Sequence, residues 1–389
     1  MSDKTDRHYM QRALDLAGQA LGRTSPNPVV GAVIVKDDAI VGEGYHQCAG
    51  LPHAEVNALE AAGAAACGST IYVTLEPCSH QGRTPPCAQA LVQAGITRAV
   101  VATVDPNPKV SGQGLKILRQ AGIEVHVGVM EEEARRQNEF FLKYISSGVP
   151  FVTLKWAMTL DGKIATAQGD SRWVSGEKSR RFVHQLRDIH DGILVGIGTV
   201  LADDPLLNTR LEKEDRRNPV RVIVDGGLEL PLDSQIIRTC RQQRTLVFCS
   251  REAERERAQR LLEAGVEVLE VQGGPEKLSI ADILTRLGQM GICSLLVEGG
   301  ASINAAFIEA GLIDKVHVFI APKIIGGRQA LTPVAGEGRR LMEQAWRLKK
   351  MEVSQVGEDL LLTAYFPQAW QRMKAEGWKE GGSDIYRYR

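Results

Sequence analysis

The sequence has little that would tie it to a membrane or to a polyanion. Its 389 residues carry 47 Lys and Arg against 47 Asp and Glu, so the formal net charge is zero. A balanced charge gives no support for binding to nucleic acid or to an anionic membrane. No apolar run approaches the roughly 20 residues that a membrane-spanning helix needs. The polar N-terminus, residues 1–7, lacks the apolar core of a secretory signal. We therefore expect a cytoplasmic protein without nucleic acid or membrane partners.

Cysteine is also scarce. The seven cysteines are an odd number, which fits free thiols in a reducing compartment rather than a disulfide framework. Two of them, Cys78 and Cys87, follow His53 along the chain. One imidazole and two thiolates offer three ligands to zinc, and three protein ligands leave the fourth position open, as in catalytic zinc sites. We expect His53, Cys78 and Cys87 to be metal ligands.

Glu55 lies two residues after His53 and has no need to bind the metal. A water bound to zinc ionises near neutral pH and becomes a nucleophile. In the zinc-dependent base deaminases, a Glu that is not a ligand is the general acid and base. The combination predicts a deaminase site with Glu55 as the catalytic residue.

The flanking residues predict where these side chains stand. His53 opens the run 54–62, which is rich in strong helix formers. Residues 71–75 read as a buried strand that ends at Cys78, and Cys87 follows two prolines, a natural helix start. All three expected ligands therefore fall at helix starts or at a strand end.

Three other interpretations of the first half stay open on these residues alone. A His and two Cys can be a buried histidine with two inert thiols, because free cysteine is often simply buried. A structural zinc would need a fourth protein ligand, for which His80 is the nearest candidate. The third is a deaminase of nucleosides or tRNA fused to an unrelated reductase. A surface rich in Lys and Arg around the zinc pocket would support it, and the balanced charge does not.

Strands and helices alternate along the whole chain, which indicates α/β domains with largely parallel sheets covered on both faces. In the first half we expect a helix over 7–21, a strand hairpin over 29–45 and a closing helix over 131–145. In the second half we expect helices over 178–188 and 301–310, and strands at 151–157, 192–197, 220–224, 245–249, 266–271, 293–298 and 315–320. The small residues and proline at 146–150 mark a boundary, which gives domains over 1–147 and 148–366 and an extension over 367–389.

The second half carries weaker signals of its own. Residues 196–201 begin like a dinucleotide fingerprint but lack the third glycine, so we reject a Rossmann site there. Residues 295–304 read as a buried strand, two glycines and a helix start. Such a turn can bind phosphate through backbone N–H groups, and it can equally be a plain tight turn.

Several segments resemble the bifunctional riboflavin-biosynthesis deaminase–reductase family. Those of the first half are 26–35, 74–87 and 105–108; those of the second are 156–165, 171–173, 198–210 and 297–300. Eight residues separate Cys78 from Cys87, whereas the commonest deaminase signature has two. The resemblance implies a cytidine-deaminase-like three-layer domain followed by a dihydrofolate-reductase-like domain. It also implies zinc-dependent deamination of a pyrimidine ribose phosphate, followed by NADPH-dependent reduction of its ribosyl group.

The resemblance also carries residue roles. The implied NADPH contacts are Ala157, Trp173, Thr199, Asp203, Gly300, Ala301, Ser302, Ile303, Asn304, Ala305 and Ala306. The implied substrate contacts are Asn27, His80 and Asn107 in the deaminase and Ser171, Arg187, Leu207, Arg210 and Glu298 in the reductase. Arginine forks suit phosphate oxygens. We further expect Arg251 to bind the cofactor 2′-phosphate, and the protein to form a homo-oligomer.

Overall fold

The structure is a computed structural model that describes residues 3–79, 86–107 and 111–373. The chain divides into two compact units, one up to Ser147 and the other Gly148–Gln371, and the described residues after Gln371 group with the first. Each unit contains its own sheet. In the described residues, no helix combines the length and the apolar character that crossing a membrane requires.

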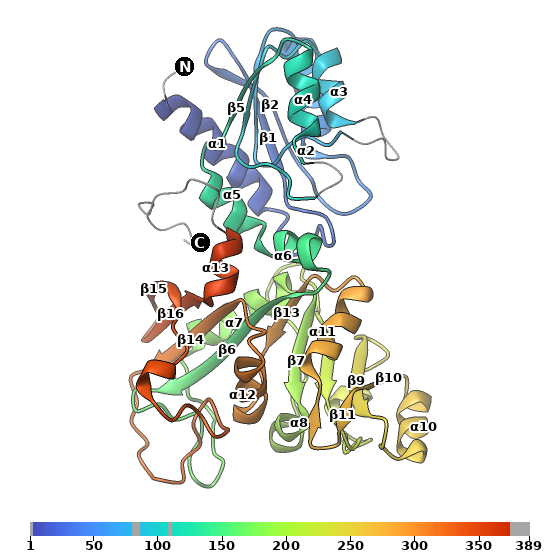
Figure 1. The fold of residues 1–389 in the computed structure, drawn as a ribbon, viewed down its shortest axis with the longest axis vertical. Helices are drawn as coiled ribbons and strands as arrows, with labels where there is room; N and C mark the ends of the chain where they lie inside the picture. Colours follow the sequence, from blue (N-terminus) through green and yellow to red (C-terminus); the bar gives the residue numbers. More distant parts are fainter. Residues whose placement is uncertain (1–2, 80–85, 108–110, 374–389) are drawn as a thin grey trace. The chain divides into compact units, whose positions relative to one another are not determined.

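The first unit is a five-stranded sheet between two layers of helices (Figure 1). The strand order is β2-β1-β3-β4-β5. The strands are β1 (Gly31–Lys36), β2 (Ala39–Tyr45), β3 (Thr70–Val73), β4 (Arg98–Val101) and β5 (Glu124–Val127). The helices are α1 (Asp3–Gly18), α2 (Ala54–Ala62), the 3-10 turn η1 (Gly63–Ala66), α3 (Cys87–Gln93), α4 (Gln113–Gln120), α5 (Glu131–Gln137) and α6 (Glu139–Ser147).

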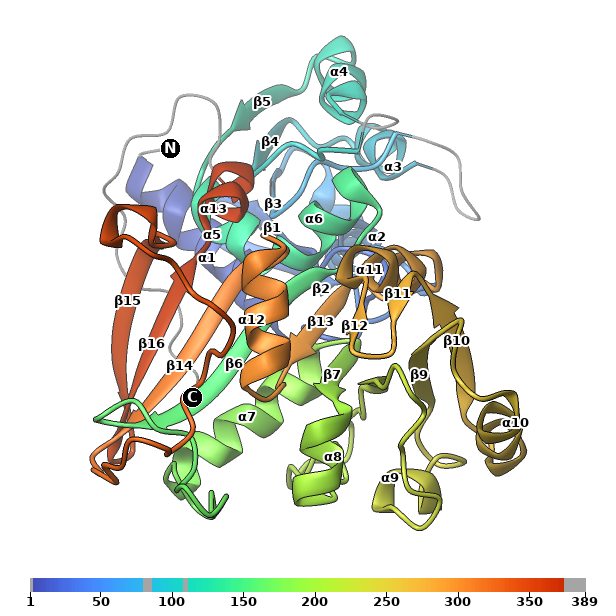
Figure 2. The same ribbon diagram turned by 60° about the horizontal axis from the view of Figure 1, so that its bottom comes forward.

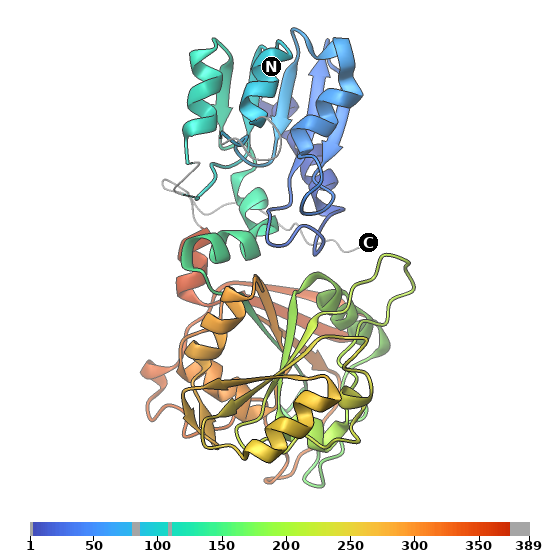
Figure 3. The same ribbon diagram turned by 90° about the vertical axis from the view of Figure 1, so that its right-hand side faces the viewer.

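Figure 3 shows α2, α3 and α4 side by side over one face of this sheet. On the other face, α1 and α5 pack on β1, β3 and β4 through a buried apolar cluster that includes Met10, Val33 and Val100. Glycines bring α2 close to its strand: a Cβ at Gly42 or Gly44 would lie within 2.5 Å of a backbone oxygen of α2. The start of α2, where His53 stands, is therefore fixed against the sheet.

Two expectations for the first unit need correction. The hairpin of β1 and β2 is present as expected. The sheet is nevertheless mixed rather than largely parallel, because β1 also pairs antiparallel with β3, while β3–β4 and β4–β5 are parallel. The single closing helix expected over 131–145 is two helices, α5 and α6. They meet at Asn138, whose side chain bonds the backbone of Val29 through both its oxygen and its nitrogen.

The second unit is built on a nine-stranded sheet of order β10-β9-β8-β7-β13-β6-β14-β16-β15, which Figure 2 shows fanning across the unit. The strands are β6 (Phe151–Thr159), β7 (Gly192–Gly196), β8 (Val220–Val224), β9 (Thr245–Ser250), β10 (Glu267–Val271), β13 (Ser294–Val297), β14 (Lys315–Ala321), β15 (Lys349–Val356) and β16 (Asp359–Tyr365), with β11 (Gly273–Gly274) and β12 (Lys277–Leu278) as a separate hairpin. Strands from β10 to β14 pair in parallel, whereas β16 pairs antiparallel with β14 and β15.

Helices cover both faces of the parallel part. They are α7 (Glu177–Ile189), α8 (Ile197–Asp203), α9 (Gln235–Arg238), α10 (Arg255–Ala264), α11 (Ile280–Gln289) and α12 (Ala301–Glu309). The chain also forms a 3-10 turn η2 (Met342–Gln344) and the helix α13 (Pro367–Met373). Side chains of α8, α9 and α10 share one apolar cluster with β7, β8 and β9, while those of α11 and α12 share another. The loops that follow the parallel strands therefore gather at one edge, where ligands of α/β sheets bind.

The strands expected in the second half are present, and so are α7 and α12. Helices between several of these strands were expected without residue ranges, and α8 to α11 stand in such places. The hairpin β15–β16 was not predicted. Strand β15 is an edge strand in which exposed positions such as Met351 and Ser354 outnumber half-buried ones. Met351 and Val353 alternate with polar residues, but both apolar side chains are exposed, so the strand lacks the apolar inward face of a half-buried strand.

Candidate active sites

The expected zinc ligands meet in the first unit. His53 is the N-cap of α2, Cys78 follows β3, and Cys87 begins α3. The Nδ1 atom of His53 lies 3.3 Å from Sγ of Cys87 and 3.6 Å from Sγ of Cys78. Ligands of a tetrahedral zinc with ordinary bond lengths are separated by roughly 3.5–3.8 Å. The donor set and its spacing therefore fit zinc.

Among the described residues, the metal-binding cluster has these three members and no fourth. His80, considered as a fourth ligand or as a substrate contact, lies outside the described residues. Cys78 is placed as an acceptor: its sulfur receives the backbone N–H of Cys87 at 3.3 Å. Hydrogen bonds from Cys87 and His53 lower the pKa of Cys78 to about 4, although burial opposes the shift. A sulfur that ionises readily is suited to hold a cation.

Glu55 lies in the first turn of α2, two residues after His53, and is almost fully buried, with 3 % of its surface exposed. Burial raises the pKa of Glu55 to about 7, and the charge of Cys78 acts in the same direction. A group with a pKa near the working pH can both accept and donate a proton during one reaction cycle. This is the behaviour that the expected role of Glu55 requires.

His46 is a neighbour of the cluster that the sequence did not single out. Its ring packs edge-on against the ring of His53, with centroids 5.4 Å apart. The Nδ1 of His46 is 3.1 Å from the carbonyl of Pro52, and its Nε2 is 3.2 Å from the amide nitrogen of Asn27. Burial lowers the pKa of His46, which favours the neutral ring that accepts from Asn27 and donates to Pro52. Asn27 thus reaches the site through one intervening ring.

Asn107 stands in the segment that follows β4. Its backbone N–H donates to Asp105 at 2.8 Å and its carbonyl accepts from Ser111. Its role as a substrate contact remains a prediction. No sequence signal marked His46, because a lone His after a strand is common in proteins without a site there.

A pocket of about 460 Å³ opens in the second unit at the strand-end edge. It collects expected residues of both kinds: Ala157, Ser171, Trp173, Arg187, Asp203, Leu207, Arg210, Glu298 and Asn304. Thr199 is not part of its lining but stands beside Gly300, where a Cβ would lie 3.5 Å from the threonine hydroxyl. The other expected cofactor residues of α12, namely Ala301, Ser302, Ile303, Ala305 and Ala306, do not line the pocket.

The polar end of the pocket is organised around Glu298, which follows β13. Arg187 of α7 donates to its carboxylate at 2.7 and 3.3 Å, and Lys155 of β6 donates at 3.3 Å. Burial disfavours the charge of Glu298, but the two cations outweigh it and lower its pKa to about 2. The sequence analysis did not single out Lys155, because one lysine within an apolar strand is equally expected at a strand position that faces solvent.

The fork of Arg187 is largely engaged within the protein. Besides Glu298, it donates to the carbonyl of Asn208 at 3.0 Å. Arg210 also lines the pocket, and its backbone N–H donates to Nδ1 of His184 at 3.2 Å. Burial and the two arginines lower the pKa of His184 to about 4, so this ring is neutral at pH 7.

The segment 171–176, which includes Ser171 and Trp173, is held from several sides. Lys323 donates to the carbonyls of Trp173 and Val174 at 2.7 and 3.0 Å. The guanidinium of Arg180 lies 4.7 Å from the centre of the Trp173 ring and donates to the carbonyl of Ser175 at 2.6 Å. Trp173 is 61 % exposed, so its ring is available to a ligand while its backbone is fixed.

Two buried polar atoms in this pocket make no hydrogen bond with a described residue: the indole nitrogen of Trp156 and the side-chain oxygen of Asn304. A buried donor and a buried acceptor without partners are costly unless a ligand satisfies them. Nicotinamide, ribose and phosphate groups offer such partners. The pocket therefore fits a nucleotide cofactor by an observation independent of the resemblance.

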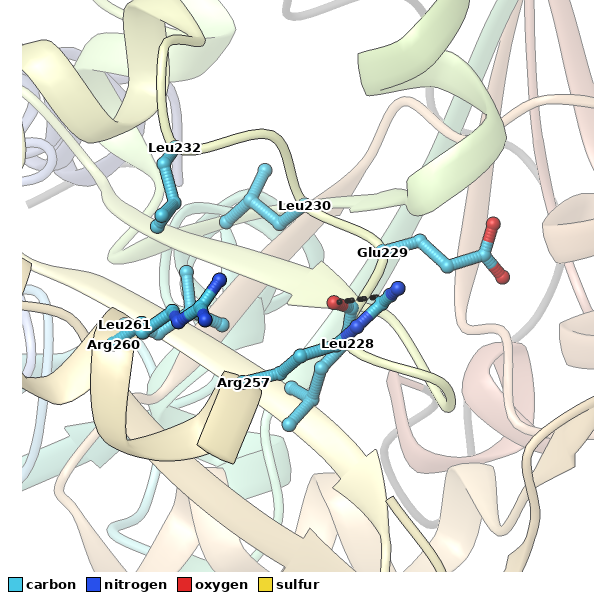
Figure 4. Close-up of a pocket in the computed structure, with 7 residues that line it drawn as sticks. All are labelled: Leu228, Glu229, Leu230, Leu232, Arg257, Arg260 and Leu261. Atoms are coloured by element: carbon cyan, nitrogen blue, oxygen red, sulfur yellow. Dashed lines mark hydrogen bonds between the residues drawn. The ribbon is translucent and has the colours of Figure 1, made fainter. Parts of the chain in front are cut away.

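A second, smaller pocket of about 240 Å³ lies between α10 and the segment after β8 (Figure 4). Four leucines, Glu229 and two arginines line it. Arg257 donates to the carbonyl of Leu228 and pairs with Glu254, while Arg260 pairs with Glu256. None of the expected site residues lines this pocket, and its cations already have partners.

Comparisons with known proteins agree with this division. Residues 3–103 match the cytidine and deoxycytidylate deaminase zinc-binding region, and residues 150–362 match the RibD C-terminal domain. The riboflavin biosynthesis protein RibD of Aquifex aeolicus is 47 % identical over 362 residues, covering 93 % of this chain and 99 % of that protein. These matches define a zinc-binding deaminase domain joined to a reductase domain.

Solved structures extend the likeness to nearly the whole chain. Acinetobacter baumannii RibD, form 1, is 42 % identical with a TM-score of 0.84, covering 94 % of this chain and all of that one. The diaminohydroxyphosphoribosylaminopyrimidine deaminase/5-amino-6-(5-phosphoribosylamino)uracil reductase of Thermotoga maritima is 39 % identical with a TM-score of 0.81, covering 94 % and 99 %. The chain belongs to the RibD family of riboflavin biosynthesis proteins. It is a bifunctional deaminase and reductase whose first domain binds zinc and whose second uses NADPH.

Proposed function

We propose that the first unit deaminates 2,5-diamino-6-ribosylamino-4(3H)-pyrimidinone 5′-phosphate. The second unit then reduces the ribosyl group of the product, 5-amino-6-(5-phosphoribosylamino)uracil, to a ribityl chain with NADPH. The observation that carries the proposal is the pair of sites: a three-ligand metal cluster beside a buried carboxyl, and a separate pocket rich in cations. The Thermotoga maritima relative carries both activities in its name.

In the deaminase, we assign the metal to His53, Cys78 and Cys87. Zinc held there would make a bound water a better nucleophile and stabilise the charge that develops on its oxygen. Glu55 would take the proton from the attacking water, pass one to the ring nitrogen, and finally protonate the departing amine. A carboxyl with a pKa of about 7 suits both directions of transfer.

The base itself would be held by side chains around the cluster. Asn27, oriented by His46, and Asn107 offer amides that can read a pyrimidine edge. His80 is kept as a substrate contact from the resemblance alone. His46 would fix the amide of Asn27 because its own Nδ1–H is committed to the carbonyl of Pro52.

In the reductase, NADPH would supply the hydride, and the protein's task is to hold the opened ribose against the nicotinamide. We assign Ala157, Trp173, Thr199, Asp203 and the start of α12 to the cofactor. Ser171 and Arg210 would bind the phosphate of the substrate, because Arg187 is already bound to Glu298. We assign the ammonium of Lys155, which lines the pocket and is held by Glu298, as the proton source for the reduced centre.

The remaining assignments extend this proposal. We propose domain limits of 1–147 and 148–366 with an extension over 367–389, a cytoplasmic location and a homo-oligomeric state. The substrates are small pyrimidine ribose phosphates. A size measurement in solution that returns the mass of a single chain would remove the oligomer from the proposal.

The test is to follow both products from the diamino substrate in one reaction. With NADPH present, ammonia release and NADPH oxidation should reach equal amounts. Without NADPH, the reaction should stop at the deaminated compound after full ammonia release. NADPH oxidation that precedes ammonia release would contradict the proposed order of the two steps.

A further inference from the structure

Glu76 is a buried carboxylate two residues before the proposed ligand Cys78, and the chemistry described above gives it no task. It is 4 % exposed and lies in the segment between the end of β3 and the metal cluster. Its backbone N–H donates to the carbonyl of Thr103 at 3.0 Å, which ties this segment to the end of the neighbouring strand β4.

Among the described residues, the carboxylate of Glu76 accepts hydrogen bonds from backbone N–H groups alone. One oxygen, Oε2, receives Asp105 at 3.2 Å and Gly112 at 3.0 Å. The other, Oε1, receives Gly114 at 2.9 Å and Leu115 at 3.4 Å. A buried carboxylate with four donors is well compensated for its lost hydration. Both oxygens are therefore occupied by the segment after β4 and by the first turn of α4.

The same helix start touches the chain directly before Cys78. A Cβ built on Gly114 would lie 2.0 Å from the carbonyl oxygen of Pro77 and 3.3 Å from the side chain of Glu76. Only glycine lets the two backbones approach this closely. The peptide that carries Cys78 is thus pressed against α4 at one point and bonded to it through Glu76 at another.

From these contacts we infer that Glu76 is a positioning residue, which fixes the Cys78 ligand against the start of α4 and the Asp105 segment. Its role resembles that of the groups outside the ligand set that orient metal ligands in other proteins. It also links the metal to the segment of Asn107, since Asp105 both donates to Glu76 and accepts from the Asn107 N–H. The inference rests on the proposed assignment of Cys78 to zinc.

Replacing Glu76 by glutamine gives the sharpest test, because the shape is kept. Whichever way the amide turns, its NH₂ group must face two N–H donors where an oxygen stood. In the full-length Glu76→Gln protein we expect zinc affinity, measured by competition with a chromogenic chelator, to fall by about 10–100-fold. In the cobalt-substituted protein, we expect the visible ligand-field bands to shift, because Cys78 no longer sits in the same geometry.

A buried carboxylate elsewhere in the same domain serves as the control. Asp6 binds Arg98 and the hydroxyl of Tyr72 and is 7 % exposed. Arg98 begins β4, whereas Glu76 lies beyond the end of the parallel neighbour β3, so the two carboxylates stand at opposite ends of the sheet. Asp6→Asn should lower the melting temperature of the domain and leave zinc affinity and the cobalt spectrum unchanged.

Gly114→Ala provides a second route to the same displacement, because the methyl group must push Pro77 away. It should weaken zinc and shift the cobalt bands as Glu76→Gln does. NADPH oxidation with the deaminated substrate reports whether the rest of the chain is intact. Zinc affinity within twofold of wild type and an unchanged cobalt spectrum in Glu76→Gln would overturn the inference, as would an equal loss of zinc in Asp6→Asn.

The outcome separates this inference from the proposed zinc site. If Cys78→Ser retains full zinc, the site itself is wrongly assigned. If Cys78→Ser loses zinc while Glu76→Gln keeps both its affinity and its spectrum, the site stands and the positioning role of Glu76 is refuted.

Discussion

The two active sites differ in how the chain encodes them. The proposed deaminase site draws its metal ligands and its acid–base residue from residues 53 to 87, on segments that adjoin one face of a small sheet. The reductase pocket is assembled from β6, α7, α8 and the residues after β13, between Lys155 and Asn304. A metal site demands particular donor atoms in a narrow geometry, whereas a nucleotide pocket demands mainly shape and a few polar groups. A metal site can therefore be predicted from a sequence, whereas a nucleotide pocket largely cannot.

The largest difference between the effects on the two activities should come from removing one thiolate. Cys78→Ser or Cys87→Ser should abolish both zinc content and ammonia release, because a hydroxyl is a poor substitute for a thiolate on zinc. NADPH oxidation with the deaminated substrate should persist, since its pocket shares no residue with the cluster. A serine variant that keeps full zinc and full deamination would remove that cysteine from the site.

Glu55→Gln should separate metal binding from catalysis within the first unit. The amide keeps the shape but cannot carry the proton, so deamination should fall by about 10²–10⁴-fold. Zinc content, measured by elemental analysis, should stay at the wild-type level. Loss of zinc in this variant would instead make Glu55 a ligand.

Acid should destabilise the reductase unit through its buried histidines. Burial lowers the pKa of His190 to about 4 from an ordinary 6.5. Between these two pKa values, His190 is protonated in the unfolded chain but neutral in the folded one. The free energy of unfolding therefore falls as the pH drops from 6.5 towards 4. For this one group the loss is on the order of 2 kcal/mol near pH 4.5.

Tryptophan fluorescence can follow that loss in the second unit, since four of the five tryptophans lie in it, at positions 156, 173, 346 and 370. In denaturant titrations across this pH range, the free energy of unfolding of His190→Gln should depend less steeply on pH than that of the wild type. The difference in slope should correspond to at most one proton fewer taken up on unfolding. Its amide can still bond Leu186 and Thr153, the present partners of the ring. An unchanged slope would assign the acid sensitivity to other groups.

Lys323 should matter for the cofactor although it lies outside the pocket lining. Lys323→Met frees the carbonyls of Trp173 and Val174, so the KM for NADPH should rise by about 3–10-fold, as expected for losing exposed charge-assisted hydrogen bonds. Lys349→Met, which removes an exposed lysine on β15, is the matched control. Equal kinetics for the two variants would show that the conformation of residues 171–176 does not depend on the hydrogen bonds from Lys323.

The smallest expected effect concerns cofactor choice. Arg251 follows β9 at the strand-end edge and is exposed. If it pairs with the 2′-phosphate, Arg251→Ala should raise the KM for NADPH a few-fold, in the range of an exposed ion pair, and leave that for NADH nearly unchanged. The same change for both cofactors, or none, would place the discrimination elsewhere.

Much of the architecture followed from local sequence. The alternation of strands and helices, the two glycines before α12 and the helix that begins at Cys87 are all present as expected. The antiparallel pairing of β1 with β3 was not predictable from the pattern, because a buried strand in a mixed sheet has the same apolar sequence as one in a parallel sheet. Likewise, the break at Asn138 depends on its distant bonds to Val29, which no local pattern reveals.

The same limit applies to the sites. The cluster of His53, Cys78 and Cys87 and the buried Glu55 could be predicted because the proposed chemistry restricts the residue types. His46, Lys155, Lys323 and Glu76 were missed, since each acts through a contact between segments far apart in the sequence. Arg187 was expected to face a phosphate, and its bonds to Glu298 and Asn208 became visible only in the folded chain.

The central claim is that zinc serves one of the two chemistries alone. It is tested most directly by stripping the full-length protein with a chelator and assaying both reactions before and after zinc is restored. Ammonia release from the diamino substrate should vanish and then recover, while NADPH oxidation with the deaminated substrate should stay at its original rate throughout. Loss of both activities on chelation, or deamination that persists in metal-free protein, would contradict the account.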